Sequence, residues 1–565
     1  MSAASNHVVK VVVNPATGAA TVQSDPSNTA RVLQIKVGKN PRGIVVNSTD
    51  SRAYVMNYIS RDVTVLSLTA TPEAVVATLP SAALPAPGTL ADAIHVGKEL
   101  YNTSIGEFEP APNTPTPITG RMSNNGWGSC AACHSPFATT DNVVWIFPAG
   151  PRKSISQHTD FDQADPTRSR MRALLWSAGR DEQEDFENNI RAVSGGLGMI
   201  VLADGITQDA NTPDLLPTAP ATPIANGGRN QLKVRGVGGW DAIKAFVQFG
   251  IRSPISPVAK TEPDVVAGRA LFQSANCQSC HGGPQWTNST INFKPPPTAV
   301  QVVAGQLVDQ LRNVGTFDPA VFNEIRQNAQ PPLGAAGFVP PSLLSLHAFP
   351  ETFLHNGSAN SLDQVLANVT HRSVGTGGVD TLSSAADRAK LVRFLLSIDA
   401  ATVPIAPSTA NVIEYFNATF DHYFITHLDA EIAKLDAGDV IKGWTRTGKF
   451  FQVNIAPRTA TSPVCRFYIP PALGDSHFFG RGPAECNATA QNNPSFVLED
   501  PAFMHLTLPT AGVCPGNTTP VYRVFSNRPD ANHRYMTDRA VRTQMVSTGW
   551  LAEGDGPDLV VMCGP

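Results

Sequence analysis

The sequence lacks any apolar run long enough to cross a membrane, and its first residues show none of the features of a signal peptide. It also lacks an excess of positive charge, because the net charge is −4 and the pI is near 6.4. A nucleic-acid-binding protein normally carries a basic patch. We therefore expect neither a membrane span nor a nucleic-acid partner.

Cysteine is scarce, with eight residues in the chain, and half of it lies in two copies of one pattern. Residues 130–134 read CAACH and residues 277–281 read CQSCH. In C-x-x-C-H the two thiols add to the vinyl groups of a haem, and the histidine binds the iron. A half zinc site would need further cysteines near by, and a thioredoxin-like pair would need a βαβ setting. We therefore expect two covalently bound haem c groups, held by Cys130, Cys133, His134, Cys277, Cys280 and His281.

The other four cysteines, Cys465, Cys486, Cys514 and Cys563, all lie in the C-terminal part of the chain. An even number in one polar module predicts two disulfides and an oxidising compartment, and the sequence does not choose among the three pairings. Attachment of haem c in bacteria also takes place outside the cytoplasmic membrane. We expect a periplasmic or secreted protein whose own N-terminus, with its signal peptide, is missing.

The length of 565 residues predicts about three or four structural units. Residues 1–85 read as β-strands, and residues 38–65 resemble one blade of a YVTN-type β-propeller, with Tyr54–Asn57 at the place of the tetrapeptide that names the family. Only about one and a half blades are present, and fewer than four do not close a propeller. We expect part of a larger propeller; the alternative is a small sheet packed on the next domain.

An internal repeat marks the haem region, residues 89–400. Gly97–Tyr101 precedes the first motif and Gly268–Phe272 precedes the second, each as a short helix with a Leu-aromatic pair. We expect two lobes related by duplication, at about 89–260 and 261–400. Residues 386–398 have apolar residues at helical spacing and predict a closing helix.

This region resembles the bacterial diheme cytochrome c peroxidase and MauG superfamily. The resemblance rests on the two motifs at this separation, on residues 175–180 (LWSAGR), and on residues 339–344 (VPPSLL) leading to residues 353–358 (FLHNGS). It covers rather more than half of the chain. It implies a mainly α, two-lobed diheme domain in which peroxide is reduced at the first haem and electrons arrive through the second from a small donor protein, a cytochrome c or a cupredoxin.

The sixth ligand of each iron decides between catalysis and electron transfer, because only an open position binds peroxide or oxygen. The superfamily often supplies a methionine to the second haem, but no methionine occurs between His281 and residue 400. His347, His355 and His371 are the alternatives, and His371 lies nearest to the expected place. His355 is the second choice, or it holds its turn by hydrogen bonds. A histidine in place of methionine would lower the reduction potential.

For the first haem we expect an open sixth position, with His158 as an exposed loop residue and Arg152 near a propionate. The competing interpretation makes His158 a sixth ligand that leaves on activation, and Met122 is an upstream candidate.

Cleavage of a bound peroxide needs an acid–base group. Glu184 and Glu187 are three residues apart and would share a helical face; the alternative is a solvated acidic face. The further glutamate of the superfamily is absent, since residues 194–199 read SGGLGM, which argues against classical peroxidase activity. Trp176 matches the tryptophan between the haems, with a core aromatic as the alternative, and Trp286 is a weaker candidate. The candidate catalytic residues are Glu184, Glu187, Trp176 and Arg180.

Residues 409–565 contain three imperfect repeats and predict a three-fold, trefoil-like β module. The module resembles one appended to many secreted bacterial enzymes. Its histidines recur in an Asp/Asn-x-x-aromatic pattern that is more typical of structural hydrogen bonds than of a metal site.

The sequence therefore predicts an exported diheme c-type oxidoreductase that reduces hydrogen peroxide. Two alternatives remain open. One is an oxygenase that uses dioxygen on an organic substrate, as in the related diheme rubber oxygenases. The other is an electron-transfer cytochrome without catalytic activity.

Overall fold

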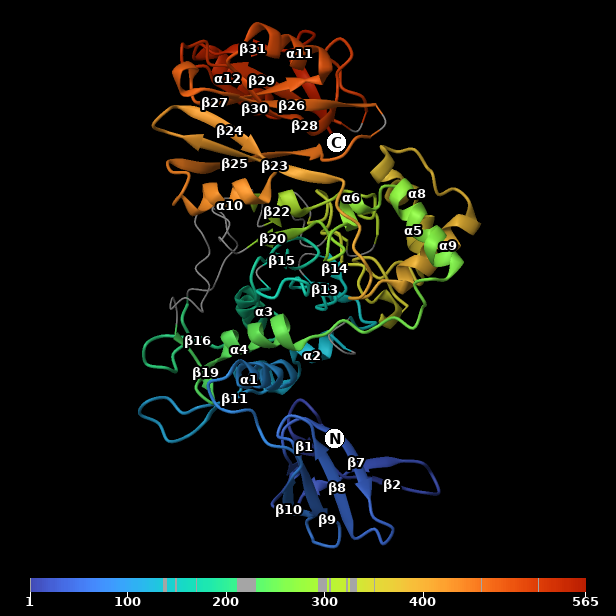
Figure 1. The fold of residues 1–565 in the computed structure, drawn as a ribbon. Helices are drawn as coiled ribbons and strands as arrows, with labels where there is room; N and C mark the ends of the chain where they lie inside the picture. The colour runs from blue at the N-terminus through green and yellow to red at the C-terminus, as the bar shows by residue number, and fades with distance from the viewer. Residues whose placement is uncertain are drawn as a thin grey trace.

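The computed structural model forms three successive parts, each with its own hydrophobic core (Figure 1). An N-terminal β part is followed by a central region with both C-x-x-C-H motifs, and a large sheet ends the chain. The structure describes residues 2–135, 140–147, 150–168, 170–210, 230–292, 302–303, 306–321, 324–325, 333–349, 351–458, 460–516 and 518–565.

The N-terminal part is built on a four-stranded antiparallel meander in the order β10-β9-β8-β7. Its strands are β7 (Pro41–Val46), β8 (Arg52–Asn57), β9 (Asp62–Ser67) and β10 (Ala74–Pro80). Residues of β8 alternate between the core and the surface, as a half-buried strand requires. Three short ladders precede it: β1 (His7–Val8) with β6 (Ile35–Lys36), β2 (Val11–Val13) with β3 (Ala20–Val22), and β4 (Ser24–Asp25) with β5 (Asn28–Val32). Such a meander is the form of one propeller blade, and the rest of a propeller stays a prediction.

The expectation of a mainly α diheme domain is wrong. Among the residues that the structure describes, 29% are in strands and 24% in helices, with many small sheets and one large one. The chain holds 47 prolines and 44 glycines, which interrupt helices and favour turns. In the central region the strands are paired in twos: β11 (Glu107–Phe108) with β12 (Ile118–Thr119), β13 (Trp145–Phe147) with β14 (Gly150–Arg152), β15 (Arg170–Arg172) with β20 (Thr290–Asn292), β16 (Ile200–Val201) with β17 (Asn230–Gln231), β18 (Lys233–Val234) with β19 (Val237–Gly238), and β21 (Val302–Val303) with β22 (Gln306–Leu307).

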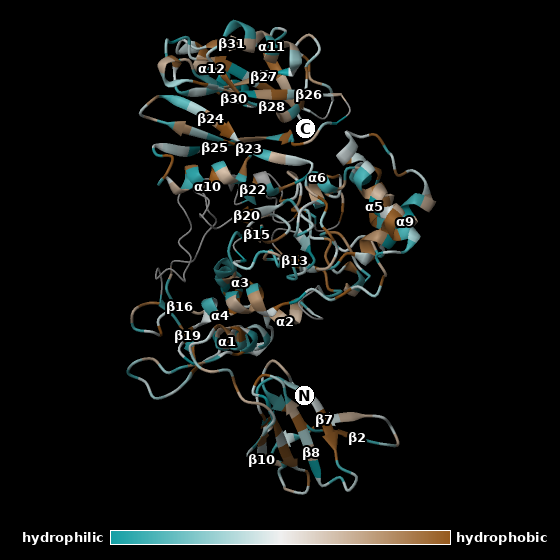
Figure 2. Ribbon diagram, viewed as in Figure 1, coloured by the Kyte–Doolittle hydropathy of each residue, from teal (hydrophilic) through white to brown (hydrophobic). Residues whose placement is uncertain are grey.

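Two similar helix pairs frame the central region. Helix α1 (Leu90–Asn102) packs on α4 (Gly239–Ala245), and α5 (Pro263–Ser274) packs on α9 (Ala385–Ser397). In both pairs a glycine stands at the crossing: a Cβ on Gly97 would overlap the carbonyl oxygen of Ala242, and a Cβ on Gly268 would overlap that of Lys390. Figure 2 shows the apolar residues of α5 and α9. The same close helix crossing therefore occurs in both lobes, and its glycine is the one that the sequence repeat contains.

Shorter helices carry the remaining turns of the central region. The α-helices are α2 (Cys130–Cys133), α3 (Glu187–Ala192), α6 (Gln278–His281), α7 (Leu362–Ala367) and α8 (Val369–Ser373). A π-helical turn, η4 (Phe246–Gly250), follows α4, and 3₁₀ turns occupy η1 (Asn124–Gly126), η2 (Gln183–Phe186), η5 (Val308–Gln310), η6 (Leu346–Ala348) and η7 (Val374–Thr376).

The C-terminal module consists of three β-β-α-β units that share one hydrogen-bonded sheet. The helix in each unit differs from the trefoil-like, all-β module that the sequence predicts. The units comprise β23 (Thr409–Asn417), β24 (His422–Thr426), α10 (Asp429–Ala437) and β25 (Trp444–Asn454); β26 (Thr461–Ile469), β27 (Ser476–Arg481), α11 (Gly482–Asn492) and β28 (Val497–Thr507); and β29 (Thr519–Phe525), β30 (His533–Met536), α12 (Arg539–Ser547), β31 (Leu551–Glu553) and β32 (Val560–Gly564), with the 3₁₀ turn η8 (Pro471–Leu473) in the second unit.

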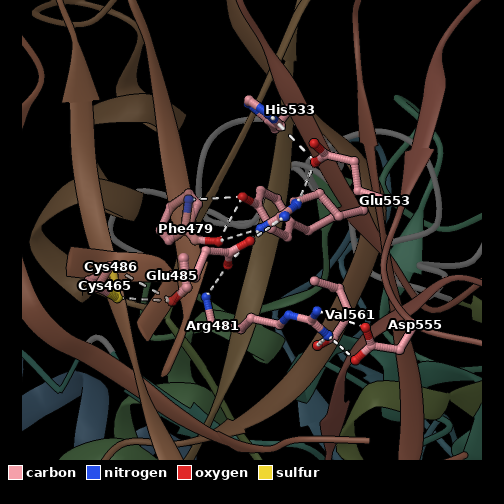
Figure 3. Close-up of polar contacts among 12 residues, drawn as sticks. Cys465, Phe479, Arg481, Glu485, Cys486, His533, Glu553, Asp555 and Val561 are labelled. Carbon is pink, nitrogen blue, oxygen red and sulfur yellow. Dashed lines mark hydrogen bonds and ion pairs between the residues drawn. A yellow bond between two sulfur atoms is a disulfide. The ribbon is translucent and has the colours of Figure 1, made fainter. Parts of the chain in front are cut away.

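Two disulfides hold this module, as the cysteine count predicts. They pair Cys465 with Cys486 and Cys514 with Cys563, which settles the pairing that the sequence left open. The first disulfide joins β26 to α11, beside the ion pairs of Glu485 with Arg523 and of Arg481 with Asp555 (Figure 3). Disulfides of this kind stabilise small extracellular modules by about 2–4 kcal/mol each.

We predict that Gly97→Ala and Gly268→Ala each lower the free energy of unfolding of the central region by about 1–3 kcal/mol, because the added methyl group forces each helix pair apart. The midpoint of denaturant unfolding, followed by circular dichroism, measures the change. Gly516→Ala is the control, since a Cβ there meets nothing within 4 Å. Equal midpoints for all three variants would contradict the close crossings.

Candidate haem sites

The first C-x-x-C-H motif forms the short helix α2, with Cys130 and Cys133 as free, half-buried thiols. Burial raises the pKa of Cys130 to about 11, and burial together with the nearby Asp141 carboxylate raises that of Cys133 to about 12. Both groups therefore stay protonated at neutral pH. Two free thiols at this spacing suit addition to haem vinyl groups.

The residues around the first motif are more buried than the sequence suggests. His158 is 1% exposed, so the expectation of an exposed loop residue is wrong. Met122 is buried in the core of the first lobe. Arg152 lies over the ring of Phe338, with its Cζ 5.2 Å from the ring centre. His158 therefore lies in the interior. Burial agrees with the competing interpretation of His158 as a sixth ligand, which stays a prediction.

The second motif presents Cys277 and Cys280 as free thiols and His281 at the end of α6. The Nδ1 of His281 lies 3.0 Å from the carbonyl oxygen of Pro341 and can donate to it. That bond would orient the ring in a metal site. Burial lowers the pKa of His281 to about 4, so the imidazole is neutral, as a metal ligand must be.

His371, on α8, faces His281. The two ring centres are 6.4 Å apart. Their planes are 69° apart, so the rings meet edge to face. Burial also lowers the pKa of His371, against an opposing effect of the Val365 backbone. Two neutral imidazoles this close could both hold one metal-containing group.

An apolar cavity contains this pair and both thiols. Its walls come from the α5/α9 helix pair and from the segments around α7, and Arg312 adds a cationic group that suits a haem propionate. Apolar side chains that line it include Phe272, Leu343, Leu346, Leu366, Leu391 and Leu395. The residues present thus fit a covalently attached haem at the second motif.

Trp176 lines the same cavity and connects it to the first motif. Its Nε1 donates to the carbonyl oxygen of Lys153 at 2.8 Å. The neighbouring Ser154 donates through Oγ to the carbonyl oxygen of Cys133 at 2.5 Å. Trp286, the weaker candidate, is buried against Phe272 at 6.0 Å between ring centres and belongs to the core.

His355 lies beside Trp176 and does not face His281. Its Nε2 is 2.5 Å from Oε1 of Glu324, and its ring stacks on Phe338 with 3.9 Å between centres. Both His355 and Glu324 are buried. His347 is half-buried on η6. Of the three histidines proposed from the sequence, His371 is therefore the one placed opposite His281.

The candidate acid–base residues are buried, so the alternative of a solvated acidic face is wrong. Glu187 accepts hydrogen bonds from the backbone of Met199 and Ile200, from Trp240 Nε1 and from Arg191, which gives it a structural role. Glu184 lies 3.5 Å from Lys244, and burial raises its pKa. Arg180 donates to the carbonyl of Gly179. None of the three, Glu184, Glu187 and Arg180, lines the cavity described above.

Sequence reasoning missed a cluster of buried carboxylates formed by Asp181, Glu182 and Asp185, whose oxygens lie within 4.8 Å of one another. Burial, with the charges of Glu184 and Asp185, raises the pKa of Glu182 to about 8. The acidic residues at 181–185 could have indicated this cluster from the sequence. The spacing of residues along a helix, however, does not show whether they are buried.

Comparison with known proteins adds little to this geometry. No protein-family model matches the chain, and no curated protein matches it. A solved structure of hydrazine synthase from Kuenenia stuttgartiensis, pressurised with 20 bar of xenon, aligns with 57% of this chain and 96% of its own, at 13% identity and a TM-score of 0.29. That score does not establish a shared fold. Within the described residues no helix is long and apolar enough to cross a membrane.

We predict that Glu182→Gln changes the pH dependence of stability. The folded chain holds a proton on Glu182 up to about pH 8, whereas the unfolded chain releases it near pH 4.3, so this group lowers stability as the pH rises between those values. The variant should gain about 1–3 kcal/mol over the natural chain between pH 5 and pH 8. Denaturant unfolding at several pH values measures the gain, and Glu351→Gln, at an exposed residue, should show none.

Proposed function

We propose that this chain is an exported diheme c-type oxidoreductase of the diheme cytochrome c peroxidase and MauG type. It reduces hydrogen peroxide at the first motif, with electrons delivered through the second from a small donor protein. The observation that carries the proposal is the pair of opposed imidazoles, His281 and His371, in an apolar cavity with two free thiols. The two disulfides agree with an oxidising compartment.

The second motif is suited to electron transfer. Covalently attached haem supplies reversible one-electron chemistry when it is bound. His281 and His371 would both hold that haem and would leave no room beside it for peroxide. Nitrogen ligands from two neutral imidazoles also favour the oxidised metal more than a thioether does. The residues of the second motif would therefore bind and orient the haem and shield it from peroxide. The reaction with the substrate would take place at the first motif.

Residues between the motifs provide a short route for electrons. Trp176 lines the second cavity, and its hydrogen bond to Lys153 continues through the next residue, Ser154, to the backbone of Cys133. The accepting atom at Trp176 Nε1 is a backbone carbonyl, which cannot take a proton. Trp176 would therefore keep its Nε1 proton while an electron passes.

Staining for covalent haem and spectroscopy of the ferric protein test the whole proposal. We expect denatured chain to stain for two haem groups, one centre to respond to cyanide, and peroxide to be consumed with a reduced donor. Unstained bands would end the proposal. Stained protein in which neither centre responds to cyanide would indicate an electron-transfer cytochrome, and consumption of dioxygen with an organic substrate would indicate an oxygenase.

We predict that His371→Ala converts the second centre from low spin to high spin, because one of the two imidazoles that would hold the haem is lost. Electron paramagnetic resonance and optical spectra of the ferric protein show the change. His347→Ala is the matched control, since His347 lies half-buried on η6 and should leave the spectra unchanged. A low-spin signal that survives in His371→Ala would move the ligand to another residue.

We predict that Trp176→Phe lowers peroxide turnover by about tenfold or more while the spectra of both centres stay unchanged. The loss follows from removing the indole that links the second cavity to Lys153. Steady-state turnover and single-turnover reduction of the first centre measure it. Trp286→Phe, in the core of the second lobe, is the control and should alter stability more than turnover.

A further inference from the structure

The three units of the C-terminal module are joined by buried ion pairs, and one junction departs from the pattern. Arg466 on β26 reaches Glu431 on α10 with two hydrogen bonds of 2.9 and 2.8 Å. Arg523 on β29 reaches Glu485 on α11 with bonds of 3.1 and 2.7 Å. Both pairs connect a strand of one unit to the helix of the preceding unit.

The third junction, between the third unit and the first, lacks this pair. In each unit the first strand pairs with the second. By this register Tyr415, which pairs with Phe424, is the counterpart of Arg466, which pairs with Phe479, and of Arg523, which pairs with Tyr535. Helix α12 carries no acidic residue. Glu414 and Arg534 join the units here with bonds of 2.9 and 2.8 Å between β23 and β30. Departures from a repeated pattern are expected at functional sites.

A cavity of about 460 Å³ opens at this third junction, between residues of the first and third units. Its volume is in the range of small-molecule sites. The first unit contributes Asp421 and Tyr423, and the third contributes Arg528, Gln544, Thr548 and Trp550. Both α12 and the loop after β23 therefore supply groups to it.

The charges in this cavity are paired and held in place. Arg528 donates to Asp421 at 2.5 Å and to Asp530 at 3.0 Å. Arg534 is paired with Glu414, and its Cζ lies 4.0 Å from the ring centre of Tyr423. Each guanidinium therefore already has a carboxylate partner and is not a free cation for an anionic ligand.

Two polar groups in the cavity remain available. Among the described residues, no hydrogen bond is made by the side-chain amide of Gln544 or by Nε1 of Trp550. The indole of Trp550 meets Tyr423 edge to face at 6.1 Å, and Cζ of Arg528 lies over the indole ring at 5.9 Å from its centre, so one ring face is left for a ligand. The cavity thus combines an aromatic ring, a free amide, an indole donor and a partly exposed carboxylate, that of Asp421.

We infer that this cavity binds a neutral saccharide. A pyranose presents several hydroxyl groups, each of which both donates and accepts, and amide and carboxylate side chains match them in pairs. Its C–H face is apolar and packs on an indole. Because both guanidinium groups are already paired, the cavity is poorly suited to an anionic ligand. This inference concerns a site apart from the haem motifs and does not depend on the proposed function.

Titration of the intact chain with cellobiose, maltose and N,N′-diacetylchitobiose, followed by calorimetry and by saturation-transfer NMR, tests the inference. We expect at least one disaccharide to bind. Trp550→Ala should weaken that binding about tenfold or more, and Gln544→Ala, on the exposed side of α12, about threefold or more. Trp550→Phe should restore most of the affinity lost in Trp550→Ala.

Trp444→Ala is the matched control. Trp444 follows a glycine in the first unit as Trp550 does in the third, and it packs on Phe424 with 5.9 Å between ring centres, outside the cavity. It should leave saccharide binding unchanged. The inference is overturned if none of the three disaccharides binds at about 10 mM, if Trp444→Ala weakens binding as much as Trp550→Ala, or if inorganic phosphate binds there in their place.

Discussion

Two neutral imidazoles that face each other in an apolar cavity cost free energy, and other contacts must hold them in place. Each buried ring has lost its hydration, and burial holds both pKa values low. The Pro341 carbonyl fixes one ring. The Asn368 side chain accepts from the backbone of His371 at 3.0 Å and starts α8 where the second ring can face the first. The α5/α9 crossing then supplies the walls.

Several features of the second lobe are encoded by short local patterns and can therefore be predicted from the sequence. Covalent attachment motifs are short and local, so the spacing in residues 277–281 predicts one from the sequence alone. The sequence indicates His371 as a candidate ligand because no methionine occurs between His281 and residue 400. The glycines at 97 and 268 repeat in the sequence because the same helix crossing repeats in space. The number of disulfides followed from the count of cysteines.

Other features depend on contacts between distant segments, which the sequence does not encode locally. The burial of Glu187 depends on Trp240, 53 residues further along the chain, which donates a hydrogen bond to it. The partner of His355 is Glu324, and no local pattern links the two. The three imperfect repeats predict a three-fold β module at the C-terminus but not the helix in each unit. The mainly α expectation came from a resemblance, and short strand pairs between the helices overturn it.

The join between the central region and the C-terminal module lies directly on the second motif. Gly283 donates to the carbonyl of Ile405 at 2.7 Å, Ser408 bonds Asn276 at 2.6 Å, and Thr409, at the start of β23, reaches the carbonyl of Ser279 at 3.2 Å. An enzyme that attaches haem needs this loop accessible. Under the proposed function, maturation therefore has an order: the cofactor is ligated first, and the last 150 or so residues close over the loop afterwards, the order in which synthesis delivers them.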